Sequence, residues 1–404
     1  MLIAGLMFKN MGIANDSIAR WTGVLGLAWA FKPLWSPFLE LARSKKFIVV
    51  AMQFTGAAGL ALMALAVQLP MFFAASIAVL FLLAYASATH DIACDGLYMA
   101  SLSAKLQAAY AGWQGAFFNA SKFLTLGGLL VLAGHLEKGM GVHHAWSVIF
   151  VLLAVILATL AAYNAWALPG ALNTDHADLS AASVLKTLGE VVADFLRKPG
   201  IWLAILFIVL FRFAEGQVQT IGPLFLIESR DQGGLGLSTE QIGYVYGTAG
   251  TLAFLVGSIL GGYFTAWLGL KRAMPVLIVA MAVPNIVFAV LATTRPTELG
   301  VIGAAIGVEM FGYGFGFVGM ILYIMQAVAP GRYQTAHYAL GSGVMQLGFI
   351  FSKTLSGDLQ LAMGYERFFL WTIACGVPAL LLMFFVRIPG REDTAAPATA
   401  EATA

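Results

Sequence analysis

Several charged side chains interrupt long apolar runs of this sequence, and these residues are the first candidates for a chemical role. An ionisable group that lies in hydrocarbon costs at least about 2.5–3.5 kcal/mol, so such groups are retained for a purpose. A buried carboxyl group can bind and release a proton, and a buried ammonium or guanidinium group can hold an anion. The charges inside apolar runs are Lys32, Asp91, Asp95, Lys122, Arg212, Glu215, Glu309, Lys353 and Asp358.

The acidic residues, one of them together with a nearby arginine, each allow two interpretations. Arg212 and Glu215 lie three residues apart, so they either neutralise one another on one helix or act in a cavity. Glu309 has no partner nearby in the sequence, and it either couples a proton or substrate or forms a structural hydrogen bond. Asp91 and Asp95 share one helix face. They either pair with basic residues across the bundle as a gate or contact the substrate directly.

Lys122 and Lys353 occur in similar contexts. Residues 121–127 read Ser-Lys-Phe-Leu-Thr-Leu-Gly and residues 352–357 read Ser-Lys-Thr-Leu-Ser-Gly, each preceded by a Tyr-Ala pair. The match is weak, but it indicates two related halves. The two lysines either bind an anionic substrate group or serve as counter-charges to the acids.

The elements that position these charges are predicted to be membrane helices. The chain has 404 residues, of which 60% are hydrophobic and only 10% are charged. Soluble proteins are usually about 25% charged, and one soluble core of this size could not bury so much apolar surface. No nucleophile–base pair, phosphate-binding loop or metal-ligand spacing appears, and the two cysteines form no disulfide framework. We therefore expect no enzymatic activity, no cofactor, no metal and no nucleic-acid partner.

Apolar runs long enough to cross a bilayer follow one another with short breaks. Met1–Phe8 is apolar but too short to cross alone, so we expect a short or truncated first helix. Either the true start codon lies upstream or this helix packs only half-way across. The other predicted spans are 18–41, 47–69, 71–100, 107–135, 144–168, 200–227, 240–267, 273–293, 298–327, 337–363 and 367–387.

A polar segment divides the chain into two six-helix halves. We predict an N-terminal half over 1–168, a linker over 169–199, a C-terminal half over 200–388 and a disordered tail over 389–404. In the linker, Leu185, Leu188, Val192 and Phe195 recur at helical spacing, which is typical of an amphipathic helix on a membrane surface. Lys and Arg are more frequent in the loops on the side of the linker and tail, so that side is predicted to be cytoplasmic.

The distribution of the charges fits one architecture, the major-facilitator plan. In that plan helices one, four, seven and ten line a central cavity, two, five, eight and eleven flank it, and the others face lipid. The charges avoid the predicted lipid-facing helices completely. By this fold-level analogy we expect an all-α polytopic membrane protein with nominally twelve transmembrane helices.

Three motifs go beyond composition. Residues 31–37 (Phe-Lys-Pro-Leu-Trp-Ser-Pro) resemble the Lys-x-Leu-Trp-Ser-Pro stretch of AmpG-type muropeptide permeases. Residues 88–96 look like that family's Gln-Asp-Ile-Ala-x-Asp-Ala signature, and residues 334–340 resemble its Gln-Tyr-Ala-Leu stretch. His90 stands where Gln is usual and Gly96 where Ala is usual, and the two additional helices of some members are missing. The resemblance also extends to acetyl-CoA transporters and some siderophore importers.

The resemblance implies proton-coupled import across a bacterial inner membrane, with an anhydro-muropeptide as the cargo of true AmpG. It identifies Lys32, Asp91 and Asp95 as motif charges. A siderophore or an acyl-CoA-like cargo is the alternative, as is a membrane sensor that binds without transport. We expect a monomer surrounded by lipid, with a small-molecule substrate and its C-terminus in the cytoplasm. The substrate-binding candidates are Arg212, Lys122, Lys353 and Glu215, and the candidates for proton coupling are Glu309 and Glu215.

Overall fold

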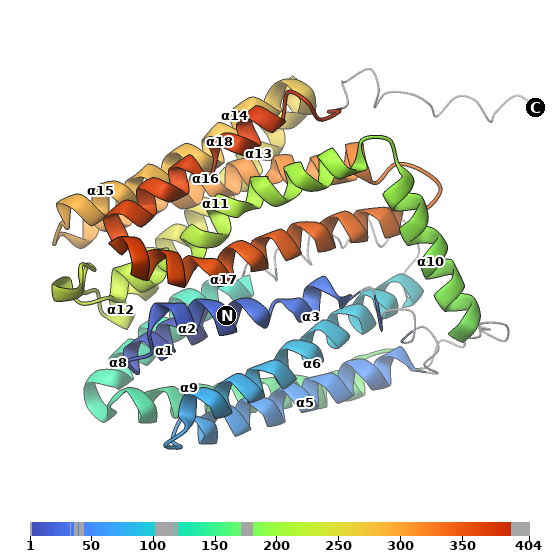
Figure 1. Cartoon of the computed structure of the whole chain (residues 1–404). Coiled ribbons are helices and arrows are strands. Elements are labelled where there is room, and N and C mark those ends of the chain that lie inside the picture. Colours follow the sequence, from blue (N-terminus) through green and yellow to red (C-terminus); the bar gives the residue numbers. More distant parts are fainter. Residues whose placement is uncertain are drawn as a thin grey trace, which may run out of the picture.

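The computed structural model describes residues 2–32, 34–35, 39, 44–101, 117, 120–170 and 181–388, and within these ranges it contains helices and no strands (Figure 1). The first half of the chain forms one group of helices, drawn blue to teal in Figure 1. They are α1 (Leu2–Asn10), α2 (Asn15–Val24), α3 (Leu27–Ala30), α5 (Lys45–Ala66), α6 (Phe72–Ser101), a π-helical segment (Phe123–Leu129), α8 (Leu130–Met140) and α9 (Val142–Ala167).

The second half forms the other group, drawn green to red. The helix α10 (Ala181–Arg197) connects the two groups at one end of the bundle (Figure 1). The later helices are α11 (Ile201–Ile227), α12 (Thr239–Ile242), a π-helical segment (Gly243–Gly250), α13 (Thr251–Leu268), α14 (Leu270–Ala282), α15 (Ile286–Thr294), α16 (Leu299–Tyr323), a π-helical turn (Ile324–Val328), α17 (Gln334–Ala374) and α18 (Val377–Leu382).

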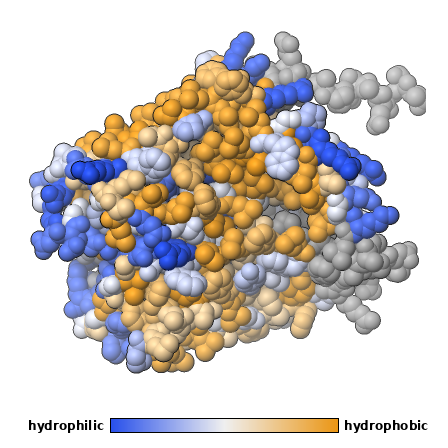
Figure 2. Space-filling view, viewed as in Figure 1, coloured by the Kyte–Doolittle hydropathy of each residue, from blue (hydrophilic) through white to orange (hydrophobic). Residues whose placement is uncertain are grey.

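The prediction of a polytopic all-α membrane protein is confirmed. Within the described ranges, eight helices are long and apolar enough to cross a membrane. Figure 2 shows apolar surface across the middle of the molecule and hydrophilic surface at its two ends. We call these ends the α10 end, which carries α10, and the α12 end, which carries α12 and the loop over 228–238 (Figure 1).

The helices differ from the predicted spans in detail. Met1–Phe8 corresponds to α1, whose nine residues extend about 13 Å, less than half of a bilayer core of about 30 Å. The predicted span 18–41 begins earlier, at Asn15, and is interrupted after Val24. The predicted boundary between the spans 337–363 and 367–387 coincides with a sharp bend of α17 at Gly364, where φ is 74°, a conformation that glycine adopts without strain.

Parts of the prediction fall on residues that the structure does not describe. The span 107–135 is described only from residue 120 onwards, apart from Phe117, and the tail over 389–404 lies outside the described residues. The linker contains α10, as the helical spacing of its apolar residues predicts.

The helix α10 is attached to the C-terminal half. Phe195 is buried, and its ring lies 5.6 Å from the ring of His337 on α17. Lys198 Nζ donates to the carbonyl oxygens of Val328 at 2.6 Å and Pro330 at 2.8 Å, at the end of the π-helical turn that follows α16. Burial lowers the pKa of Lys198, and the Asp194 carboxylate opposes that effect. A cation at a helix C-terminus compensates the unpaired carbonyl groups there.

Small residues let the two halves approach closely, as is common between membrane helices. A Cβ on Gly247 would lie 1.9 Å from the carbonyl oxygen of Leu126. A Cβ on Gly357 would lie 2.4 Å from the Cα of Asp16. These contacts join the segment before α8 to that before α13, and α2 to α17.

We expect Gly247→Ala to destabilise the protein by about 1–3 kcal/mol, because its Cβ would meet backbone atoms of Leu126 that cannot move independently. Thermal unfolding in detergent measures this effect. The matched control is Gly128→Ala, since a Cβ on Gly128 meets nothing within 4 Å. Equal unfolding temperatures for the two variants would contradict this account of the interface.

Candidate functional site

Arg212 lies among aromatic rings. Its guanidinium carbon is 4.5 Å from the ring centre of Phe349, 4.8 Å from that of Phe317 and 5.6 Å from that of Tyr313. It also donates a hydrogen bond of 3.2 Å to the Tyr313 hydroxyl. Such cation–π contacts hold a cation where carboxylates are few. Arg212 on α11 is therefore positioned by rings from α16 and α17.

The same aromatic surface reaches the other half of the molecule. Lys122 Nζ lies 5.4 Å from the ring centre of Phe254 on α13. The ring of Phe254 lies 5.0 Å from that of Tyr313, which contacts Arg212. Two predicted substrate-binding cations, one from each half, thus lie along one row of rings. We call Lys122, Phe254, Tyr313, Arg212, Phe317 and Phe349 the cation–aromatic row.

Lys353 follows Phe349 by one turn of α17, and it is 9% exposed. Within the described residues, its ammonium group has no hydrogen bond or ion pair. A Cβ on Gly23 of α2 would lie 3.6 Å from its Cγ, so Lys353 lies where α17 meets the N-terminal half. Lys122 correspondingly meets α13 of the C-terminal half. The two lysines therefore hold related positions, as the weak sequence repeat predicts.

Two buried glutamates, Glu215 on α11 and Glu309 on α16, lie near the cation–aromatic row. Glu215 and Glu309 are each 1% exposed. Gln219 lies one turn after Glu215 on α11 and donates a hydrogen bond of 3.1 Å from Nε2 to Glu309 Oε1. The Tyr246 hydroxyl donates to Gln219 Oε1, also at 3.1 Å. The segments that carry these residues are α11, α16 and the π-helical segment before α13.

Several carboxylate oxygens of this group remain open. Within the described ranges, both oxygens of Glu215 and Oε2 of Glu309 lack a hydrogen-bond partner. Arg212 and Glu215, one turn apart, form no ion pair there either, because the guanidinium group lies against the rings. The guanidinium charge still acts on the Glu215 carboxyl group across one turn of the helix. Mutual neutralisation and a role in a cavity both stay predictions.

Glu309 has partners that local sequence could not reveal. Gln219 and Tyr246 are distant from it along the chain, and neither carries a charge that would single it out in a hydrophobic run. The aromatic neighbours of Arg212 were missed for a similar reason, because rings are common in membrane helices. A signal does exist for Gln219, since a polar amide one turn from Glu215 shares its helix face.

The motif charges come together in the N-terminal half. Lys32 Nζ lies 2.5 Å from Asp91 Oδ2 and 3.9 Å from Asp95 Oδ2. This pairing joins the residues after α3 to α6, within one half. Both aspartates are more than half exposed, so the pair is accessible to water and screened by it. A gate role for Asp91 and Asp95 and direct substrate contact both stay predictions.

Comparison with known proteins identifies the architecture. A model of the major facilitator superfamily matches residues 1–353. The chain belongs to this superfamily. The predicted fold is thereby confirmed, and so is a role in transport across a membrane.

Relatives of this transporter carry the AmpG name that the three motifs suggest. This chain is 26% identical to the anhydromuropeptide permease of Escherichia coli K12 over 398 residues, which cover 96% of this chain and 76% of that protein. It is 23% identical to a transporter named AmpG 4 from Rickettsia conorii, over 94% of this chain and 90% of that protein. The resemblance to AmpG-type permeases is confirmed.

Solved structures show the same fold at low sequence identity. A bacterial homologue of the human lysosomal transporter Spinster, in an inward-facing and unoccupied conformation, superposes with a TM-score of 0.71 and 13% identity, over 95% of this chain and 91% of that one. The nucleoside transporter NupG superposes with a TM-score of 0.67 and 18% identity, over 95% and 94% of the two chains.

We expect Gln219→Leu to destabilise this transporter by about 1–3 kcal/mol, since it leaves the buried Tyr246 hydroxyl without its acceptor and Glu309 Oε1 without its donor. Chemical or thermal unfolding in detergent measures the loss. The same substitution should cost less in a Tyr246→Phe background, where one of the two groups is already absent. Equal costs in the two backgrounds would show that the Tyr246–Gln219 contact contributes nothing.

Proposed function

We propose that this transporter is a proton-coupled symporter that imports an amphipathic solute, such as an anhydro-muropeptide, across a bacterial inner membrane. The two halves alternate access to a site between them. One observation carries the proposal. Two buried carboxyl groups with open oxygens, Glu215 and Glu309, lie beside a cation–aromatic row that runs from one half to the other.

The cation–aromatic row supports a cargo with both anionic and ring-shaped parts. Arg212, Lys122 and Lys353 can pair with carboxylates, which hold a cation more strongly than neutral acceptors do. The half-buried rings of Phe254, Phe317 and Phe349 present flat apolar surface. A sugar–peptide has both features. The relative in Escherichia coli is named for an anhydromuropeptide, which makes this sugar–peptide the leading cargo.

The carboxyl cluster supports coupling to protons. An ionised carboxylate that is buried without donors costs several kcal/mol, and a proton that binds it removes that cost. Glu215 follows Arg212 by one turn of α11, so a change of charge on one acts on the other. Protonation of Glu309 or Glu215 can therefore alter how firmly Arg212 holds an anion. In this scheme a proton gradient is the driving force and no cofactor takes part.

The α10 end is assigned to the cytoplasm in this proposal. The loops on its side carry the larger share of Lys and Arg. Lys32, Asp91 and Asp95 come late in their predicted spans toward that side, so they would form or trigger a cytoplasmic gate when the halves rock. The transporter is proposed to act as a monomer.

We expect Glu309→Gln to abolish the accumulation of radiolabelled anhydro-muropeptide that an inward proton gradient drives into proteoliposomes, because the amide cannot carry the proton. Counterflow without a gradient should persist, since the binding surface is intact. Glu366→Gln is the matched control, as Glu366 is exposed at the α12 end. Unchanged accumulation by Glu309→Gln would remove its coupling role.

The same assay decides between cargoes and classes. The absence of uptake by folded unmodified protein would exclude the muropeptide and direct the test to siderophores or acyl-CoA-like molecules. Binding without exchange would identify a sensor in place of a transporter.

We expect Lys353→Met to raise the apparent KM for the anionic cargo roughly tenfold, because one charge-assisted contact contributes about 1.5–3 kcal/mol. Initial rates of uptake over a range of cargo concentrations measure the change. The matched control is Lys271→Met, which removes an exposed lysine at the start of α14. If both variants keep the unmodified KM, Lys353 does not bind the cargo.

A further inference from the structure

The two halves are tied together by polar contacts at the α12 end, and the short helix α1 takes part in two of them. Ion pairs between the halves join Lys9 to Glu228 and Lys138 to Glu240. Lys9 and Asn10 are the last two residues of α1. They reach two different groups of side chains, each of which includes residues of the C-terminal half.

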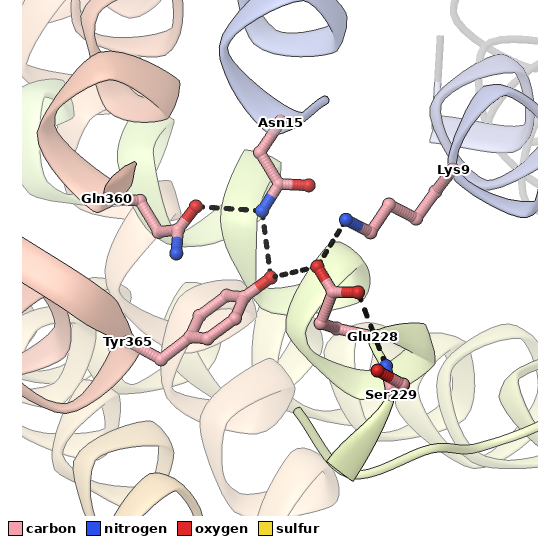
Figure 3. A network of polar contacts seen from close by, with 6 residues as sticks. All are labelled: Lys9, Asn15, Glu228, Ser229, Gln360 and Tyr365. Carbon is pink, nitrogen blue, oxygen red and sulfur yellow. Dashed lines mark hydrogen bonds and ion pairs between the residues drawn. The ribbon is translucent and has the colours of Figure 1, made fainter. Parts of the chain in front are cut away.

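The first group centres on Glu228, the residue that follows α11 (Figure 3). Its carboxylate pairs with Lys9 of α1 and accepts a hydrogen bond of 3.2 Å from the Tyr365 hydroxyl. The Tyr365 oxygen in turn accepts from Asn15 Nδ2 at 2.8 Å, and the same amide donates to Gln360 at 2.8 Å. Four helices, α1, α2, α11 and α17, are thereby connected through one carboxylate.

The second group centres on Glu137 of α8. Asn10 Nδ2 donates to Glu137 Oε1 at 3.0 Å and to the Thr239 hydroxyl at 2.6 Å. The Thr239 hydroxyl donates to Glu137 Oε2 at 2.7 Å, and Trp146 Nε1 donates to Oε1 at 2.8 Å. Thr239 begins α12, so this group also joins the two halves. A single half-buried carboxylate with several donors is a well-satisfied acceptor.

Exposure distinguishes these contacts from an ordinary surface pair at the same end. The side chains of Lys9 and Glu228 are 13% and 16% exposed. Those of Arg20 and Asp358, which also join the halves, are 53% and 50% exposed. Water and salt screen the second pair, so this exposed ion pair contributes little to the stability of the protein. The Lys9–Glu228 pair is largely withdrawn from water and interacts more strongly.

We propose that the last turn of α1 is a latch that holds the α12 end closed, with Lys9 on Glu228 and Asn10 on Glu137 and Thr239 as its two arms. The halves cannot separate at this end without breaking both arms. The latch concerns the position of the halves and does not depend on the cargo or the coupling ion.

Distances between spin labels test the latch. The labels are attached to cysteines that replace Met140 and Glu366, exposed residues of the two halves at the α12 end, in a Cys94→Ala, Cys375→Ala background. We expect Lys9→Met and Glu228→Gln each to raise the ratio of long to short distances about tenfold, as loss of a charge-assisted contact predicts. The double variant should exceed neither single variant, because both remove the same contact.

The matched control is Arg230→Met. Arg230 lies at the same end, but among the described residues it donates only to carbonyl oxygens of Arg295 and Pro296, within its own half. Its variant should keep the unmodified distances. A distance distribution for Lys9→Met and Glu228→Gln that matches the control would overturn the proposal, as would effects of the two substitutions that simply add.

Two more variants keep the test decisive if Lys9→Met does not fold. Lys9→Arg retains the charge and should keep the short distance. Asn10→Ala leaves the ion pair intact, breaks only the second arm and should give a smaller shift in the same direction. If Lys9→Arg opens the end as far as Glu228→Gln does, or if Asn10→Ala changes nothing, the two-armed latch is wrong.

Discussion

The cost of placing a charge in hydrocarbon governs the arrangement of this transporter. Each ionisable group inside the bundle must find a ring, a hydrogen bond, an opposite charge, a proton or a ligand. Arg212 finds three aromatic rings, one of which also accepts its hydrogen bond, Lys32 finds two carboxylates, and Glu309 finds an amide. The groups whose compensation is incomplete, Glu215 above all, are the places where a mobile proton acts in the proposed mechanism.

The helix α11 connects the two parts of the candidate site. One stretch of it carries Arg212, which faces the cation–aromatic row, and Glu215 and Gln219, which face the buried carboxyl cluster. Over such a short distance a proton on one group and an anion at the other influence each other electrostatically. A rigid helix transmits that influence without any rearrangement of the backbone. This is the physical basis on which coupling between proton and cargo rests in the proposed mechanism.

The interface between the halves contains two kinds of contact, close backbone packing at glycines and polar contacts at carboxylates. Glycines such as Gly247 allow backbone-to-backbone contact between the halves that carries no charge. At the α12 end, carboxylates such as Glu228 and Glu137 collect donors from both halves. Apolar contacts of the first kind can slide and tilt at modest cost, whereas the second kind has discrete partners and is either made or broken. A rocking transporter needs both.

The sequence by itself determined the membrane architecture, the family resemblance and the identity of the buried charges, because composition and span length follow from the bilayer alone. It also indicated the related positions of Lys122 and Lys353. Only the tertiary structure decided the partners. Gln219 beside Glu309, the rings around Arg212, and Lys32 with Asp91 within one half all depend on how helices far apart in the chain pack. The role of α1 belongs to the same class, since nothing near Lys9 and Asn10 in the sequence points to Glu228 or Glu137. Local patterns report which face of a helix is apolar, whereas the pairing of polar groups is a property of the assembled bundle.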